Sequence, residues 1–314
     1  MISEVVCQNF KGIKIENQIV SIITIPDIGG KIISIRDKKN DFEFVFDKSN
    51  DGLKISNYGS NFDIESPAGI DECFPTVGKC RYPEYPWEGT VIPDHGEIWP
   101  LKFKTSIMGS CSIRQEVNGI RFPYLFKRKI RLIRNMIIFS YQLISLCSMD
   151  FKYGWSMHPQ FVIREDSIIE VKNHPDFYVD FSTKYNFNSN DKKYQWPYAT
   201  GKENNKIDFS KVINIGDGSL TKLYLSGIQD NMVSLFYKKE KQKLGVKLDS
   251  GNSSICGIAL NKGGWPFNGK PYKWIGIEPC NCITDKLSDS VERGFFGLLK
   301  HKSIRNWEVS FVIN

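Results

Sequence analysis

Apolar and polar residues alternate along most of the chain with the two-residue period that is typical of half-buried β-strands. The clearest example is the C-terminal segment, in which one face consists of Trp307, Val309, Phe311 and Ile313. No segment shows a sustained 3.6-residue apolar repeat, and the best helical candidate is the short stretch 285–294. Many strands and few helices predict an all-β sandwich or barrel.

The strand-like segments follow one another through short turns. The first covers residues 19–26, stops at Gly29 and Gly30 and resumes after them, and paired glycines between such runs mark a tight connection or bulge. Segments 127–133 and 136–146 predict a hairpin that turns at Arg134 and Asn135, within a meander of hairpins. Further strands are expected at 101–107, 111–117, 161–166, 167–173, 177–183, 221–227, 232–238, 243–249, 254–260, 273–279 and 306–314.

Two long stretches interrupt this pattern. Residues 69–90 hold so many prolines and glycines that neither a regular helix nor a central strand is expected there, while their aromatic residues argue against disorder. Long loops in compact domains are usually either functional or disordered, so we interpret this stretch as one ordered loop that carries function. The polar residues 185–210 predict a second long surface loop.

Composition limits the class of protein. The chain has 314 residues, of which 41% are hydrophobic and 13% aromatic, so a sizeable core is expected. Neither a linker nor a short repeat divides it, and we predict a single domain over residues 1–314. The first 18 residues lack the apolar core of a signal peptide, and no run of about 18 uncharged apolar residues occurs, which predicts a soluble cytoplasmic protein. The eight cysteines follow no disulfide framework, which favours reduced thiols.

The net charge of +7 raises the question of a nucleic-acid partner. In the basic stretch 126–135, Lys129 and Arg131 alternate with Ile130 and Leu132, as on a strand with one solvated face. No nucleic-acid motif accompanies the charge, so we expect neither a nucleic-acid nor a membrane partner.

Candidate chemistry centres on the segment VIPDHGEIWP, residues 91–100, which places His95 beside Asp94 in a polar bend. Of the other three histidines, His174 and His301 lie in turn-like surroundings and are expected at the surface. His158 stands at the edge of a strand, directly before Pro159, where either a function or a buried, hydrogen-bonded structural role explains it.

Glu278 ends an apolar strand directly before Pro279. A carboxylate at the end of a buried strand costs free energy unless it is paired or hydrogen-bonded. A function is one explanation for its presence there.

The combination of PDHGEIW at 93–99, the pair His158–Pro159 at the start of a strand, and GIEP at 276–279 resembles the aldose 1-epimerase (galactose mutarotase) family, and more closely a divergent galactose mutarotase-like branch of it. The resemblance covers nearly the whole chain, because the N-terminal IPDIGGKI and the order and spacing of the three motifs also fit. It implies a large antiparallel β-supersandwich whose curved face opens into a sugar-binding cleft.

The resemblance also implies a reaction and its catalytic residues. His158 would be the acid at the ring oxygen, Glu278 the base at the anomeric hydroxyl and His95 a second donor to the ring oxygen. Together they would interconvert the α and β anomers of an aldose by ring opening, with no metal or other cofactor. The expected partner is a small sugar, and the sequence leaves the oligomeric state open.

The chain departs from the family at several positions, so the resemblance does not imply that the sugar is galactose. Asp94 stands where typical members have an asparagine, and GIDECFPTVGKCR replaces an upstream glycine-arginine motif. The family's substrate-binding aspartate has three candidates here, namely Asp217, Asp230 and Asp249.

We further expect contacts to the sugar from Asp94 and from aromatic side chains, whose faces pack against the C–H patches of a pyranose, although core packing explains the aromatics equally well. The aromatic candidates are Tyr82, Trp87, Trp99 and Trp265. Lys79 and Arg81 lie in the loop that leads to His95, and we hypothesise that they approach an anionic group on the sugar.

Two other classes stay open at this point. His95-Gly96-Glu97 has the spacing of a metal-binding H-x-E motif, with His158 as a further ligand, which would indicate a metal-dependent β-barrel enzyme. Alternatively, a non-catalytic carbohydrate-binding or regulatory protein can share the same fold.

Overall fold

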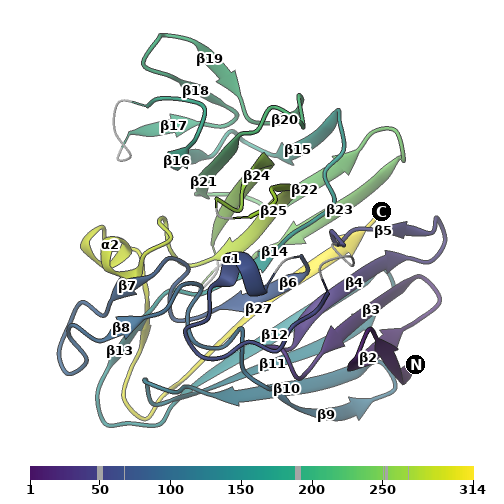
Figure 1. The fold of residues 1–314 in the computed structure, drawn as a ribbon, viewed down its shortest axis with the longest axis vertical. Coiled ribbons are helices and arrows are strands. Elements are labelled where there is room, and N and C mark those ends of the chain that lie inside the picture. The colour runs from purple at the N-terminus through teal and green to yellow at the C-terminus, as the bar shows by residue number, and fades with distance from the viewer. Residues whose placement is uncertain (48–51, 67, 188–191, 250, 252–253, 268) are drawn as a thin grey trace.

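The computed structural model describes residues 1–47, 52–66, 68–187, 192–249, 251, 254–267 and 269–314. Two large antiparallel sheets pack face to face and form the body of the structure, so the prediction of an all-β sandwich is confirmed (Figure 1). Among the described residues, no helix has the length and apolar character that a membrane span requires.

The first sheet has 14 strands and carries the candidate site. Across the sheet the order is β1 (Ile2–Cys7), β2 (Phe10–Glu16), β3 (Val20–Ile25), β4 (Lys31–Asp37), β6 (Ile70–Cys73), β14 (Ser156–Pro159), β25 (Tyr272–Cys280), β24 (Ile255–Trp265), β21 (Leu220–Ser226), β16 (Asp176–Ser182), β17 (Lys193–Gln195), β18 (Tyr198–Thr200) and β19 (Lys206–Asp208), with β5 (Phe42–Glu43) paired to β4.

The second sheet has nine strands and contains the predicted hairpin meander. Its order is β20 (Lys211–Val212), β15 (Ser167–Val171), β22 (Met232–Tyr237), β23 (Gln242–Lys247), β27 (Ile304–Ile313), β12 (Met136–Ser145), β11 (Tyr124–Ile133), β10 (Ser112–Asn118) and β9 (Lys104–Gly109). Two small ribbons pair β13 (Phe151–Tyr153) with β26 (Gly297–Leu299), and β7 (Cys80–Arg81) with β8 (Val91–Ile92).

Two short helices complete the described structure. The expected helix is α2 (Leu287–Glu292), whereas α1 (Phe62–Glu65) has only four residues and no apolar repeat that could predict it. In Figure 1, α1 lies over the first sheet near β6 and β14.

Alternate residues of the central strands divide between the sandwich core and the opposite face. On β25, Ile275 and Ile277 belong to the main apolar core between the sheets. Trp274 and Glu278 have the other parity and therefore point to the outer face of the first sheet. The same alternation places His158 of β14 on that outer face, because its neighbour Met157 packs in the core.

The prediction that residues 69–90 contain no central strand is wrong. Its first residues form β6, a fully buried strand between β4 and β14. Two acidic residues in this strand are neutralised by basic residues far away in sequence: Lys31 forms an ion pair with Asp71, and Arg128 forms one with Glu72. The pattern of residues along the sequence does not show such long-range pairing. Residues 70–73 were therefore included in the predicted loop.

The solvated face expected for the basic stretch 126–135 is present, with one exception. Lys127, Lys129 and Arg131 are partly exposed on β11, but Arg128 has the same parity as Ile130 and is fully buried. Its guanidinium crosses the sandwich to Glu72 on β6.

Two further strand predictions need correction. Of the segment 161–166, only Phe161 forms isolated bridges, and the neighbouring strand is β14 instead. The stretch 185–210 is more regular than a loop, since β17, β18 and β19 extend the first sheet there, while residues 188–191 lie outside the described residues.

The tight connection at Gly29 and Gly30 is confirmed. Gly29 has φ +72° and lies so close to the backbone of Trp99 that a Cβ would stand 2.1 Å from its carbonyl oxygen. Only glycine fits that conformation and that contact. The turn between β3 and β4 thereby anchors the loop that carries His95 and Trp99.

Candidate active site

Four central strands of the first sheet bring polar side chains together on its outer face. Ser156 of β14 pairs with Cys280 of β25, so the antiparallel register places His158 beside Glu278. His158 Nε2 lies 3.8 Å from Glu278 Oε1. Both side chains are buried, and Glu278 Oε1 has no hydrogen-bond partner among the described residues.

Lys222 on β21 reaches Glu278 across the intervening strand β24. Its Nζ donates a short hydrogen bond to Glu278 Oε2. The residue of β24 between them is Gly257, and a Cβ there would stand within 3.4 Å of both the Lys222 Nζ and the Glu278 carboxylate. The missing side chain of Gly257 therefore opens the path for this ion pair. Gly276 plays a similar part, since its Cβ would stand 2.6 Å from Glu278 Oε1.

A second carboxylate lies on the other side of Lys222. Asp285 Oδ1 is 3.8 Å from Lys222 Nζ and accepts a short hydrogen bond from the Tyr224 hydroxyl. Burial and the neighbouring charge of Asp285 raise the pKa of Asp180 to about 7. The buried ammonium of Lys222 is thus surrounded by carboxylates.

The loop around His95 is held in an unusual backbone conformation. His95 and Gly96 have φ of 58° and 77°, and a Cβ on Gly96 would stand 2.1 Å from the Phe74 carbonyl oxygen. That carbonyl accepts a hydrogen bond from the Glu97 backbone N–H at 2.7 Å. The glycine after His95 therefore allows the loop to close on the segment that follows β6.

The imidazole of His95 is fixed on two sides. Its Nδ1 lies 2.9 Å from Asp94 Oδ2, and its ring stacks on Phe62 of α1 with centroids 3.5 Å apart. The His158 ring stands almost perpendicular to it at 5.0 Å. Because Asp94 engages Nδ1, the Nε2 atom is the one left for a ligand.

The electrostatic surroundings shift the pKa values of His95 and His158 in opposite directions. Burial lowers the pKa of His95, but the adjacent Asp94 outweighs it and the pKa rises overall. Burial, together with the positive charges of His95 and Lys222, holds the pKa of His158 well below its usual range. His95 therefore holds its proton to a higher pH than His158 does, because its pKa is raised and that of His158 is lowered.

Asp94→Asn should remove this stabilisation and lower the pKa of His95, because the amide carries no negative charge. The measurement is an NMR titration of the four histidine rings in wild type and variant. His301 provides an internal control, since it lies on the surface and pairs with Asp150. An unchanged His95 pKa would show that Asp94 does not set it.

A cavity of about 270 Å³ joins these groups. Its polar lining consists of Asp63, Asp94, His95, His158, Lys222 and Asp285, and its apolar lining includes Phe181, Trp265 and Trp274. Glu278 does not line it, because Lys222 and His158 stand in front of that carboxylate. The combination of aromatic walls and a few charged groups is typical of a small-ligand site.

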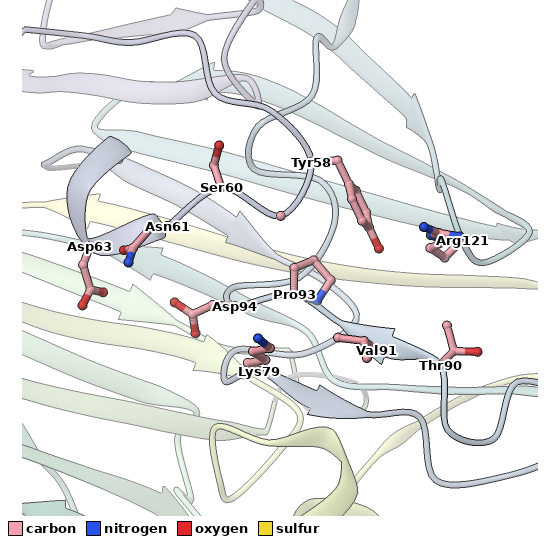
Figure 2. Close-up of a pocket in the computed structure, with 11 residues that line it drawn as sticks. Tyr58, Ser60, Asn61, Asp63, Lys79, Thr90, Val91, Pro93, Asp94 and Arg121 are labelled. Carbon is pink, nitrogen blue, oxygen red and sulfur yellow. The ribbon is translucent and has the colours of Figure 1, made fainter.

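A second, open cavity of about 860 Å³ continues from the first and shares Asp63 and Asp94 with it. Figure 2 shows these two carboxylates at one end and Arg121 at the other, with Lys79 and Tyr58 between.

The structure brings only part of the predicted substrate set to the cavity. Asp94 and Trp265 line it, while Trp99 packs edge-on against Phe62 and donates its indole N–H to the Asp94 carbonyl oxygen. Trp87 instead packs with Tyr82 and the aromatic cluster around Phe151.

The two basic residues of the anionic-group hypothesis lie apart. Arg81 is exposed and donates to the Gly89 carbonyl oxygen, whereas Lys79 lines the second cavity.

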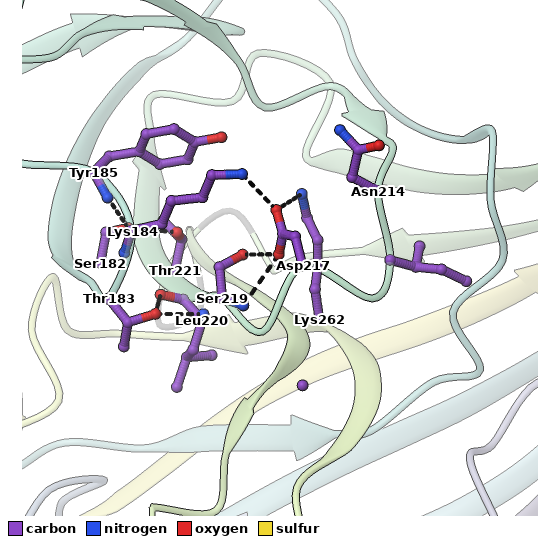
Figure 3. Close-up of polar contacts among 12 residues, drawn as sticks. Ser182, Thr183, Lys184, Tyr185, Asn214, Asp217, Ser219, Leu220, Thr221 and Lys262 are labelled. Carbon is purple, nitrogen blue, oxygen red and sulfur yellow. Dashed lines mark hydrogen bonds and ion pairs between the residues drawn. The ribbon is translucent and has the colours of Figure 1, made fainter.

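The three candidates for the substrate-binding aspartate, Asp217, Asp230 and Asp249, lie outside the lining of this cavity. Asp217 binds Lys184 and Lys262, and Ser219 donates to it (Figure 3). Although burial opposes it, the hydrogen bond from Lys184 and those from Ser219 lower the pKa of Asp217 to about 2. Asp230 forms an ion pair with Lys172, and none of the three candidates lines the cavity.

The sequence analysis missed Asp63, Lys222, Asp285 and Trp274. A usable signal existed only for Lys222, which is the one charged residue of the strand LTKLYLS, all of whose residues except the last are buried. Asp63 depends on α1, which is too short to leave a periodic pattern.

The hypothesis that His95-Gly96-Glu97 is a metal-binding H-x-E motif does not agree with the position of the Glu97 side chain. Glu97 accepts hydrogen bonds from the Arg121 backbone N–H and the Tyr124 hydroxyl at 2.8 and 2.9 Å, away from His95 and Asp94. Within the part of the chain that the structure describes, no three His, Cys, Asp or Glu side chains are placed to hold a metal ion.

Comparison with known proteins agrees with the fold. Solved structures with the galactose mutarotase-like β-sandwich match almost the full length of the chain at low sequence identity, so the chain has this fold.

Three of these structures give the scale of the likeness. A galactose mutarotase related enzyme from Lactobacillus acidophilus superposes with a TM-score of 0.68 at 16% identity, covering 96% of this chain and 97% of that one. A galactose mutarotase-like protein from Lactobacillus casei gives 0.68 at 16% identity, covering 96% and 100%. Another from Clostridium acetobutylicum gives 0.68 at 14% identity, covering 100% and 98%.

Sequence comparison reaches less far. Residues 2–91 match the model of a domain of unknown function, DUF5107. No curated protein matches the chain.

Proposed function

We propose that this protein is an aldose 1-epimerase-like isomerase that interconverts the α and β anomers of a small sugar in the cavity on the outer face of the first sheet. The carrying observation is that His95 and His158 both line this cavity with their ring centroids 5.0 Å apart, and that Glu278 Oε1 lies 3.8 Å from His158 Nε2. The ring oxygen and the anomeric hydroxyl of a sugar are bonded to one carbon, so an acid and a base for this reaction must lie close together. The low-identity likeness to galactose mutarotase-like structures supports the same class.

The reaction needs only proton transfers. Glu278 takes the proton of the anomeric hydroxyl, the O1 electrons form the C1=O bond, and the bond from C1 to the ring oxygen breaks. The ring oxygen receives a proton from a histidine, the aldehyde rotates, and the reverse steps close the ring on the other face. Each positioned acid or base contributes roughly 10²–10⁴-fold.

The two histidines divide the work at the ring oxygen. His95 supplies the proton, because the adjacent Asp94 raises its pKa and so favours its charged form. His158, whose pKa is depressed, is neutral in the free enzyme and orients the ring oxygen through its Nε2. The family resemblance alone would give the acid role to His158, and variants of the two residues separate these assignments.

The first test is NMR saturation exchange between the two anomers of a panel of neutral, phosphorylated and acidic aldoses. At least one sugar should exchange faster with the protein than in buffer. Arg114→Met, an exposed substitution on β10, serves as the matched preparation control. If no sugar exchanges faster while saturation-transfer spectra still show binding, the protein is a non-catalytic sugar-binding module and the proposal fails.

The pH dependence of the exchange should be bell-shaped. Burial raises the pKa of Glu278 even though Lys222 opposes the shift, so activity is lost as the pH falls through that raised value. His95 must be protonated, so activity is also lost as the pH rises through its raised pKa. Asp94→Asn should move the alkaline limb to lower pH, and a profile that keeps its alkaline limb in this variant would assign the acid to another group.

A further inference from the structure

Lys222, rather than Glu278, is the charged group that faces the cavity from the floor of the site. Lys222 lines the cavity with 5% of its side chain exposed, whereas Glu278 is fully buried behind it. A ligand on the floor of this cavity therefore meets the ammonium group next to the carboxylate.

The ammonium group has donor capacity that its known partners do not use. Lys222 Nζ carries three N–H donors. One of them binds Glu278 Oε2, and Asp285 lies at 3.8 Å, beyond hydrogen-bond distance. The Tyr224 ring also lies 5.3 Å from Nζ, but among the described residues no second oxygen accepts from it, so donors remain for an oxygen of a bound sugar.

The strand arrangement fixes where that oxygen would lie. Lys222 approaches Glu278 over Gly257, and His158 approaches the same carboxylate from the opposite neighbour, β14. The three side chains form a row across β21, β25 and β14, with the free oxygen of Glu278 facing His158. An oxygen that gives its proton to Glu278 thus stands within reach of Lys222.

We propose that Lys222 binds the anomeric oxygen of the sugar and stabilises the negative charge that develops there as Glu278 removes its proton. The assignment rests on the proposed function, since it takes Glu278 as the base. Lys222 keeps its own proton throughout the reaction. Charge-assisted hydrogen bonds are about twice as strong as neutral ones. The contact with Lys222 therefore becomes stronger as the anomeric oxygen gains negative charge.

The rival role is purely structural. Lys222 could serve only as the counter-ion that makes a buried Glu278 tolerable, and its loss would then raise the pKa of Glu278 and destabilise the fold. A loss of activity in Lys222→Met alone does not separate the two roles.

A binding comparison in the Glu278→Gln background separates them. This background removes the buried negative charge that needs Lys222 and stops turnover, so Lys222→Met can be added without leaving a lone buried carboxylate at position 278. The probes are the aldose with the fastest exchange in the panel, or D-galactose where none exchanges, and its 1,5-anhydro derivative, which keeps the ring oxygen and lacks the anomeric hydroxyl. Dissociation constants are measured by calorimetry.

Adding Lys222→Met should weaken aldose binding by roughly tenfold or more and leave the 1,5-anhydro sugar within about twofold. An equal effect on both sugars, or no effect on either, would overturn the contact with the anomeric oxygen. Failure of every sugar to exchange or bind would instead overturn the proposed function, and with it this assignment.

The pH profile of the single variant provides a second measurement. If Lys222 acts only as a counter-ion, the exchange rate of Lys222→Met relative to that of wild type at the same pH should recover at higher pH, where Glu278 ionises without help. Contact with the anomeric oxygen predicts a loss that persists at every pH, with Lys222→Arg retaining part of the rate because it keeps the charge. Full recovery at high pH would overturn the proposal.

Discussion

Glu278→Gln should slow anomer exchange by roughly 10²–10⁴-fold, because the amide has nearly the same shape as the carboxylate and cannot accept the proton of the anomeric hydroxyl. The measurement is saturation exchange with the best sugar of the panel. Binding of the sugar should survive, since Lys222, His158 and the aromatic walls of the cavity remain in place.

Glu97→Gln is the matched control for this variant. Glu97 is also a fully buried glutamate, but its carboxylate binds Tyr124 and the Arg121 backbone outside the cavity. The same chemical change at that position should leave the exchange rate within about twofold, because no catalytic interaction is removed. Equal rate losses in both variants, or a full rate in Glu278→Gln, would rule out Glu278 as the base.

The three catalytic candidates could be proposed from the sequence because each stands in a short, recognisable motif, and the order of the three motifs resembles that of a known family. A histidine followed by glycine in a polar bend, a histidine before proline, and a glutamate at the end of an apolar strand are visible without a structure. The structure places His158 and Glu278 side by side on two strands of the first sheet and brings the loop of His95 against His158, although the three segments are far apart in sequence.

Lys222 and Asp63 could not be proposed in the same way. The function of Lys222 depends on the neighbours that β21 acquires, since its partner Glu278 lies two strands away and reaches it only because Gly257 has no side chain. Asp63 reaches the cavity from a four-residue helix, which is shorter than any periodic signal. The local pattern of apolar and polar residues indicates which face of a strand a side chain lies on. It does not indicate which strands become neighbours in the sheet.

The central strand β6 shows the same limit more clearly. The prolines and glycines of residues 69–90 predicted a loop that included these residues, yet they form a buried strand whose two carboxylates are paired with cations. The compensating cations, Lys31 and Arg128, come from β4 and β11. A carboxylate in a buried strand thus indicates that a basic side chain elsewhere pairs with it. The sequence alone does not identify that side chain.

Arg128→Met should destabilise the fold by about 3–5 kcal/mol, because it leaves Glu72 as an unpaired buried charge. The ion pair is 2.8 Å long, both side chains are fully buried, and Arg128 also donates to Gln115 and to the Gly30 carbonyl oxygen. Glu72 keeps its hydrogen bonds from the Tyr141 hydroxyl and the Trp155 indole, but these carry no positive charge. Urea unfolding followed by fluorescence gives the free energy of unfolding.

Arg114→Met makes the same substitution on the neighbouring strand β10, where the side chain is exposed and pairs loosely with Glu116 at 3.9 Å. It should cost at most about 1 kcal/mol, as exposed ion pairs do. Adding Glu72→Gln to Arg128→Met should restore part of the lost stability, since the double variant has no lone buried charge. This pair joins β11 of one sheet to β6 of the other, so a small effect of Arg128→Met, or no recovery in the double variant, would mean that apolar packing alone holds the two sheets together at this point.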